Sequence, residues 1–303
     1  MAEHRIASGD VELAVVEAGD PARPAVLLLH GYPDTKEVWA GVVARLEPRY
    51  HVIAYDTRGA GRSSAPAPGG GARAAGYALE RLVDDALAVL DAVCPGKAVH
   101  LVGHDWGSIA GWELAISPLS SGRLASFTSV SGPCLDHFGH WVRDGLRRPT
   151  PARLAALAGQ ARRSWYVVAL GLPGAAPLAW RTVGRHWPRW MARAEGVPEG
   201  DGHPAPTVAL DGERGAGLYR ANVRRHLRAP RPDPVARVPV QLVVATRDRY
   251  ISPAVFDGVE RWAPGLRRRQ LDTSHWVPRT QPEVLAGWIA EFVDDVDLTT
   301  SKY

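Results

Sequence analysis

The chain of 303 residues has few cysteines and no long hydrophobic run. Its two cysteines, Cys94 and Cys134, are too few for a disulfide framework, and they predict reduced thiols in a cytoplasmic protein. No stretch approaches ~18 uninterrupted apolar residues, which argues against a membrane-spanning helix. The first residues lack a basic segment followed by an apolar one, so we expect no secretory signal. With 46% hydrophobic and 22% charged residues, the composition excludes a disordered or collagen-like chain.

The chain also lacks the short motifs that hold metals, phosphates and nucleic acids. It contains no HExxH sequence, no paired CxxC motifs and no phosphate-binding loop that ends in GK[ST]. We therefore expect neither a metal nor a cofactor. No sequence motif supports a nucleic-acid partner either.

Short apolar segments alternate with longer amphipathic ones along most of the chain. Residues 77–93 carry apolar side chains at three- and four-residue spacing, which predicts a helix. The segment 65–76, rich in glycine and alanine, predicts a flexible loop. The alternation predicts an α/β protein with a mostly parallel sheet covered by helices on both faces. The predicted strands are 11–17, 25–29, 51–56, 98–103, 125–132 and 238–246.

Residues 134–232 interrupt this alternation with helical patterns that proline and glycine punctuate. They hold 16 Arg, no Lys and 7 Asp and Glu, so this segment carries about +9 in a chain of net charge +4. We predict a helical lid at 134–232, inserted between two strands of an α/β core formed by 1–133 and 233–303. The basic surface has two interpretations. It is a solvated helical face, or it attracts an acidic substrate tail, an anionic membrane surface or a partner.

An apolar strand runs directly into Gly103-His104-Asp105-Trp106-Gly107 and then into a helical pattern. Small residues at 103, 107 and 108 permit a sharp turn that exposes the central side chain above the sheet. This is how the nucleophile elbow G-x-S-x-G works, here with aspartate in place of serine. The alternative is a glycine-bounded turn in which Asp105 caps the helix.

Three further segments support the first interpretation. His30-Gly31-Tyr32-Pro33 follows a buried strand, and the backbone N–H of Tyr32 can join that of Trp106 in an oxyanion hole, because proline has no N–H. Asp248 follows a later strand, and His275 lies on a late loop. The order nucleophile, acid, histidine is that of the hydrolase fold. A simple turn at 30–33 and a structural histidine are the alternatives.

Together these segments resemble the α/β-hydrolases with an aspartate nucleophile, and the epoxide hydrolases in particular. The resemblance covers nearly the whole chain and is close to the hydrolase domain of bacterial fusions of an epoxide hydrolase with a short-chain reductase. The family motifs are an HGxP loop, a D-x-RGxG-x-S turn, a GHDWG elbow, a late Asp and a late His-Trp. This chain has HGYP at 30–33, DTRGAGRS at 56–63, GHDWG at 103–107, Asp248 and His275-Trp276.

The resemblance implies two lid tyrosines that hold the epoxide oxygen. Tyr166 and Tyr219 are the only tyrosines within 134–232, and both local sequences match the family. The alternative is two ordinary tyrosines at a helix interface. In the implied mechanism, Asp105 attacks a ring carbon, and a water activated by His275 and Asp248 hydrolyses the ester to a vicinal diol. The side chains that we expect to contact the substrate are Pro33, Trp106, Trp165 and Trp276.

Two other functions compete with this prediction. Haloalkane dehalogenases share the fold and the aspartate, and often hold the halide with the Trp after the nucleophile and an Asn in HGNP; here Tyr32 takes the place of that Asn. A catalytically silent binding protein of this fold is the other alternative. Ser274 and Thr246 also stand where the family often has glycine. The expected partners are a small apolar epoxide and water, for a monomer or homodimer.

Overall fold

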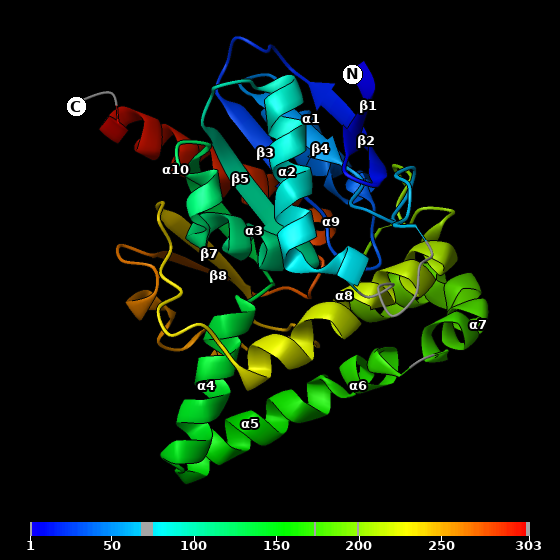
Figure 1. Ribbon diagram of the computed structural model, residues 1–303, viewed down its shortest axis with the longest axis vertical. Helices are drawn as coiled ribbons and strands as arrows, with labels where there is room; N and C mark the ends of the chain where they lie inside the picture. Colours follow the sequence, from blue (N-terminus) through cyan, green and yellow to red (C-terminus); the bar gives the residue numbers. More distant parts are fainter. Residues whose placement is uncertain (1, 68–74, 173, 199, 301–303) are drawn as a thin grey trace.

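An eight-stranded sheet forms the centre of the computed structural model, which describes residues 2–67, 75–172, 174–198 and 200–300 (Figure 1). The strand order is β1-β2-β4-β3-β5-β6-β7-β8. Strand β2 pairs antiparallel with both β1 and β4, and all other neighbours are parallel, which confirms the predicted α/β class. The strands are Ala2–Ser8 (β1), Val11–Ala18 (β2), Ala25–Leu29 (β3), His51–Tyr55 (β4), Val99–His104 (β5), Leu124–Val130 (β6), Val240–Ala245 (β7) and Arg267–Leu271 (β8).

Helices cover both faces of the sheet because the central strands are apolar on both faces. Every residue of β3, β4 and β5 is buried. One hydrophobic core lies under α2 and α3, and the other lies under α1 and α10. The helices of this part are Ala40–Leu46 (α1), Leu79–Val93 (α2), Trp106–Ile116 (α3), Val277–Thr280 (α9) and Pro282–Thr300 (α10).

The sequence pattern misses both edge strands, β1 and β8. Strand β8 has the sequence Arg-Arg-Arg-Gln-Leu, and two of its arginines form ion pairs with α10, from Arg267 to Asp295 at 2.7 Å and from Arg269 to Glu291 at 2.6 Å. These side chains are polar, so the strand shows no hydrophobic alternation. Most of the predicted loop 65–76, namely 68–74, lies outside the described residues.

Between β6 and β7, the described residues form five α-helices, which lie beyond the carboxyl ends of the parallel strands (Figure 1). Apart from one bridge between Gly200 and His203, the described residues of this stretch form no strand. This agrees with the helical content predicted for 134–232, whereas the division into core and lid domains stays a prediction. The cap helices are Leu135–Arg147 (α4), Pro151–Arg163 (α5), Trp165–Gly171 (α6), Ala175–Trp190 (α7) and Val208–Arg228 (α8).

Within the described residues, no helix combines the length and the hydrophobicity needed to cross a bilayer.

Candidate active site

Asp105 lies at the sharp turn between β5 and α3. Its backbone adopts φ +52° and ψ −118°, a region that residues with a side chain rarely occupy. The glycines around it allow close packing: a Cβ on Gly103 would lie 2.3 Å from the carbonyl oxygen of Gly107, and one on Gly107 would lie 2.1 Å from that of Leu29. The sequence around Asp105 therefore produces the predicted elbow.

The Asp105 carboxylate faces the HGYP turn and His275. The backbone N–H of Tyr32 donates to Oδ1 at 2.8 Å, and Nε2 of His275 lies 3.6 Å from Oδ2. The carboxylate accepts no capping hydrogen bond from α3, so the helix-cap alternative is wrong. One oxygen is thus held by the backbone, and the other is next to the imidazole.

The His275 imidazole is fixed by Asp248 at the end of β7. Its Nδ1 lies 2.7 Å from Oδ2 of Asp248, whose Oδ1 accepts the N–H groups of Tyr250 at 2.7 Å and Ile251 at 2.9 Å. Burial favours the neutral imidazole, but the negative charges of Asp248 and Asp105 outweigh it and hold the pKa of His275 well above its usual value. Nδ1 donates to the carboxylate, so Nε2 is the atom that faces Asp105.

Tyr166 from α6 and Tyr219 from α8 lie on the cap side, opposite the nucleophile. Their rings meet edge to face with centroids 5.9 Å apart. Burial, followed by the negative charge of Asp105, raises the pKa of the Tyr166 hydroxyl above its usual value. Burial, Tyr166 and Asp105 do the same for Tyr219. Both phenols therefore stay protonated at neutral pH.

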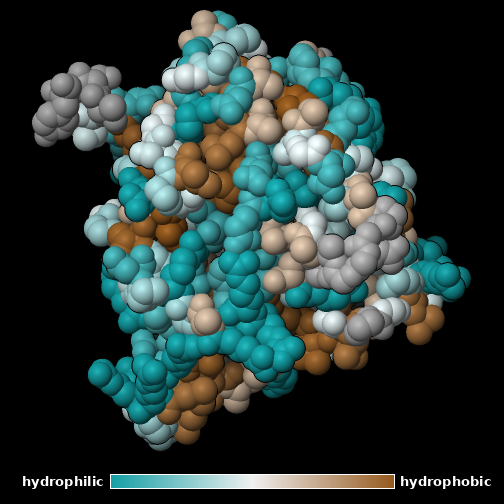
Figure 2. Space-filling model, viewed as in Figure 1, coloured by the Kyte–Doolittle hydropathy of each residue, from teal (hydrophilic) through white to brown (hydrophobic). Residues whose placement is uncertain are grey.

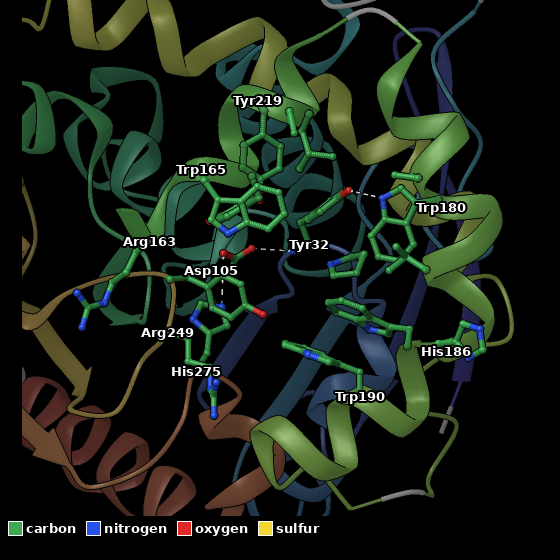
Figure 3. Close-up of a pocket in the computed structure, with 18 of the residues that line it drawn as sticks. Tyr32, Asp105, Arg163, Trp165, Trp180, His186, Trp190, Tyr219, Arg249 and His275 are labelled. Carbon is green, nitrogen blue, oxygen red and sulfur yellow. Dashed lines mark hydrogen bonds and ion pairs between the residues drawn. The ribbon is translucent and has the colours of Figure 1, made fainter. Parts of the chain in front are cut away.

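A cavity of about 740 Å³ opens over Asp105, between the core and the cap (Figure 3). Pro33, Trp165 and Trp276 line it, as predicted for substrate contacts. Trp106 is not among the described residues that line the cavity. Its side chain is 3% exposed and packs edge to face against the ring of Tyr219. The expectation that the Trp106 side chain touches substrate is therefore corrected: it supports Tyr219 instead.

A model of the α/β hydrolase fold matches residues 24–280. The chain belongs to the α/β-hydrolase fold family. It is 38% identical over 291 residues to "Probable oxidoreductase EphD" of Mycobacterium tuberculosis, a match that covers 95% of this chain and 48% of that protein. The chain thus spans about half the length of this relative.

Epoxide hydrolases are among the shorter sequence matches and among the solved structures that superpose on this chain. An epoxide hydrolase of Caballeronia sordidicola is 43% identical over 115 residues, which covers 38% of this chain and 32% of that protein. The structure of a Bacillus megaterium epoxide hydrolase superposes with a TM-score of 0.78 and 20% identity, over 96% of this chain and 100% of that one. At 20% identity, this structural similarity shows that the two chains share a fold.

Three buried polar residues of this chain, Asp34, His104 and His203, support the site, and the sequence analysis assigned no role to them. Oδ1 of Asp34 lies 2.8 Å from Nε2 of His203 in the cap, and Oδ2 accepts the indole N–H of Trp276 at 2.8 Å. Burial opposes ionisation of Asp34, but His203 outweighs it and lowers the pKa to about 2. His104 donates from Nε2 to the carbonyl of His275 at 3.0 Å, and burial lowers its pKa to about 4.

The sequence analysis did not predict several other aromatic residues that line the cavity, Trp180 among them. The indole N–H of Trp180 donates to the Tyr32 hydroxyl at 2.7 Å, and that hydroxyl donates to the carbonyl of Gly212 at 2.8 Å (Figure 3). Among the described residues, no cluster of three or more His, Cys, Asp or Glu is arranged to hold a metal. The further aromatic lining residues are Trp187, Trp190 and Tyr250.

Proposed function

We propose that this protein is an epoxide hydrolase that converts an apolar epoxide to a vicinal diol through an ester on Asp105. One observation carries the proposal: the Asp105 carboxylate and the hydroxyl-bearing rings of Tyr166 and Tyr219 line the same largely apolar cavity. The names of the shorter matches support the same reaction.

In the first step, Oδ2 of Asp105 attacks a ring carbon while Oδ1 stays on the N–H of Tyr32. A carboxylate acts as a nucleophile without a general base. The C–O bond of the strained ring breaks, and its electron pair stays on the departing oxygen. Tyr166 and Tyr219 hydrogen-bond to this oxygen, and one of them gives it a proton. The product of this step is a hydroxyalkyl ester of Asp105.

Ester formation also prepares the second step, because it removes the negative charge of Asp105. That charge is one of the two that raise the pKa of His275. Once it is gone, His275 releases its proton, which replaces the proton that the tyrosine gave to the ring oxygen. The neutral imidazole then becomes the base that deprotonates a water. The imidazolium that forms is stabilised by Asp248.

The water attacks the carbonyl carbon of the ester, and the negative charge collects on Oδ1. The N–H groups of Tyr32 and Trp106 stabilise this oxyanion, and a donor of this kind typically contributes ~3–4 kcal/mol. Collapse of the intermediate breaks the ester C–O bond, and the His275 imidazolium gives its proton to the departing alkoxide oxygen, which releases the diol. The carboxyl proton of Asp105 then returns to His275 and restores the carboxylate beside the imidazolium. In this scheme helices α4–α8 act as the lid, and no cofactor takes part.

The test is incubation with aryl and alkyl epoxides and with 1-halogenated alkanes, followed by measurement of diol and of free halide. We expect diol from wild type and none from Asp105→Asn. His275→Gln accumulates the ester, visible as added mass on the peptide that contains Asp105. Full turnover by His275→Gln contradicts the assigned base. Release of halide without diol supports the dehalogenase alternative. If neither diol nor halide forms, the result supports the catalytically silent binding protein.

A further inference from the structure

The outer surface of cap helices α5, α6 and α7 exposes large hydrophobic side chains. Figure 2 shows such side chains along the lower edge of the molecule, where these helices lie in Figure 1. Of ten large hydrophobic residues that are exposed in the described part of the chain, seven fall between residues 145 and 194. Apolar side chains gathered on a surface in this way indicate an interaction site. They are Leu146, Leu154, Trp165, Val168, Leu172, Leu178 and Val183, with exposed fractions between 41% and 71%.

The same segment is positively charged throughout. Residues 145–194 contain nine arginines and no Asp, Glu or Lys. None of these arginines forms an ion pair with a carboxylate of the described residues; the cap arginines that do so, such as Arg225 and Arg231, lie outside the segment. The positive charge is therefore not neutralised within this part of the protein. The arginines are Arg147, Arg148, Arg153, Arg162, Arg163, Arg181, Arg185, Arg189 and Arg193.

Helical spacing places the two kinds of side chain next to each other. On α6, Trp165 and Val168 are three residues apart, which puts the two on one face, and Leu172 follows directly after the helix. On α7, Leu178 is followed at the same spacing by Arg181 and Arg185. The exposed face of α6 is thus apolar, and that of α7 begins apolar and continues with arginines.

The mouth of the active-site cavity opens within this surface. Trp165 and Val183 are both exposed and line the cavity, and Arg162 and Arg163 stand at its edge. His186, one helical turn after Val183, is also among the lining residues. Exposed residues of this surface therefore also line the cavity.

We propose that the surface of α5, α6 and α7 docks on an anionic lipid bilayer, and that the cavity receives its epoxide from the lipid phase. The second clause rests on the proposed function. Apolar side chains flanked by arginines are what an interfacial membrane contact requires, since the former enter the acyl region and the latter bind anionic headgroups. Tryptophan at the rim fits the membrane interface. A bilayer also accommodates separate, protruding side chains without a shaped partner surface.

The first experiment is flotation with vesicles of phosphatidylcholine alone and of phosphatidylcholine mixed with phosphatidylglycerol. We expect the wild-type protein to bind the mixed vesicles, and binding to weaken with added salt. The double variant Val168→Asp/Leu178→Asp alters residues that do not line the cavity and lowers the partition coefficient by more than about 10-fold. The matched control is Leu119→Asp, on the core and 68% exposed, which leaves binding unchanged.

The charge is tested separately. Arg181→Gln/Arg185→Gln/Arg189→Gln lowers partitioning into mixed vesicles by on the order of 100-fold, about five-fold per arginine. The control is the same triple substitution of exposed core arginines, at Arg5, Arg23 and Arg81. Equal binding of wild type to neutral and mixed vesicles, or equal loss in both triple variants, overturns the proposal. So does binding to an acidic protein with no binding to vesicles.

Turnover separates this proposal from the proposed function. With a water-soluble epoxide, both cap variants retain the wild-type rate; with an epoxide dissolved in mixed vesicles, they lose activity in proportion to their lost binding. Equal activity of variants and wild type on the vesicle-borne epoxide overturns delivery from the lipid phase. Vesicle binding without diol from either substrate supports docking and refutes the epoxide hydrolase assignment.

Discussion

The contact between Gly31 and the nucleophile gives a sharp test of the site geometry. The HGYP turn packs so closely on the elbow that the N–H of Tyr32 reaches Oδ1 of Asp105 at 2.8 Å. A Cβ on residue 31 would lie 2.4 Å from Cβ and 2.5 Å from Oδ1 of Asp105, and 2.8 Å from the carbonyl oxygen of His104. Favourable contacts between such atoms require ~3.5–4.0 Å. In Gly31→Ala, the turn or the carboxylate must therefore move.

We expect Gly31→Ala to lower both the stability of the protein and the rate of ester formation. Overpacking of this kind typically lowers the free energy of unfolding by ~1–3 kcal/mol. A nucleophile displaced by about 1 Å loses on the order of 100-fold in rate, equivalent to ~2.7 kcal/mol in the barrier. Gly287, on an exposed part of α10, is the matched control, because no neighbouring atom lies within 4 Å of its added Cβ. Gly287→Ala should stabilise the protein by ~0.5–1 kcal/mol and leave the rate unchanged.

The assay is a single turnover with enzyme in excess, in which rapid quenching and mass spectrometry follow the ester on Asp105. Urea unfolding gives the stability of each variant. We expect slow ester formation in Gly31→Ala and a wild-type rate in Gly287→Ala. If Gly31→Ala forms ester at the wild-type rate and unfolds at the wild-type urea concentration, the close packing of the two turns is refuted.

Three further predictions concern the proton donors, the histidine and a buried ion pair. Tyr166→Phe and Tyr219→Phe each slow ester formation by ~10²–10⁴-fold but leave hydrolysis of a preformed ester unchanged, as single-turnover kinetics would show. Asp248→Asn removes a charge that raises the pKa of His275, so the acidic limb of the pH–kcat profile moves to lower pH while the plateau falls by ~10⁴-fold. An acidic limb at the wild-type pH in Asp248→Asn would contradict the role of Asp248 in raising the pKa of His275. Asp34→Asn lowers the unfolding free energy by ~3 kcal/mol at neutral pH. The pKa of Asp34 falls from 3.8 to about 2 on folding, so its stabilisation is present above pH 3.8 and disappears as the pH falls through 2. In urea unfolding, the difference in unfolding free energy between Asp34→Asn and wild type must therefore become smaller as the pH falls. A difference that does not change with pH would contradict the assignment of the stabilisation to the Asp34 charge.

The elbow and the chain order of the proposed catalytic residues could be predicted from the sequence because their signals are local. The turn at Asp105 depends on glycines at 103 and 107, which lie within a few residues of it and leave a visible motif. Asp248 and His275 follow from chain order on a known topology. The same reasoning could not place the Trp106 indole, since which face of α3 meets Tyr219 depends on a cap helix more than a hundred residues away.

The residues that pack around the proposed catalytic residues have no local sequence motif that would predict their positions. Asp34 and His203 are 169 residues apart, and only the packing of the cap on the core brings them together. Trp187 and Trp190 of α7 would look the same in sequence if they were buried in the cap interior. A tryptophan on an amphipathic helix fits either place, so composition alone does not separate a cavity wall from a core.

The backbone of Asp105 has a consequence for engineering this scaffold. A side-chain-bearing residue at φ +52° and ψ −118° costs ~1–3 kcal/mol, whereas glycine adopts that conformation freely. Heat resistance and turnover therefore compete at this single position. A directed-evolution campaign that scores only survival at high temperature would favour loss of the nucleophile, so each round must also be screened for product.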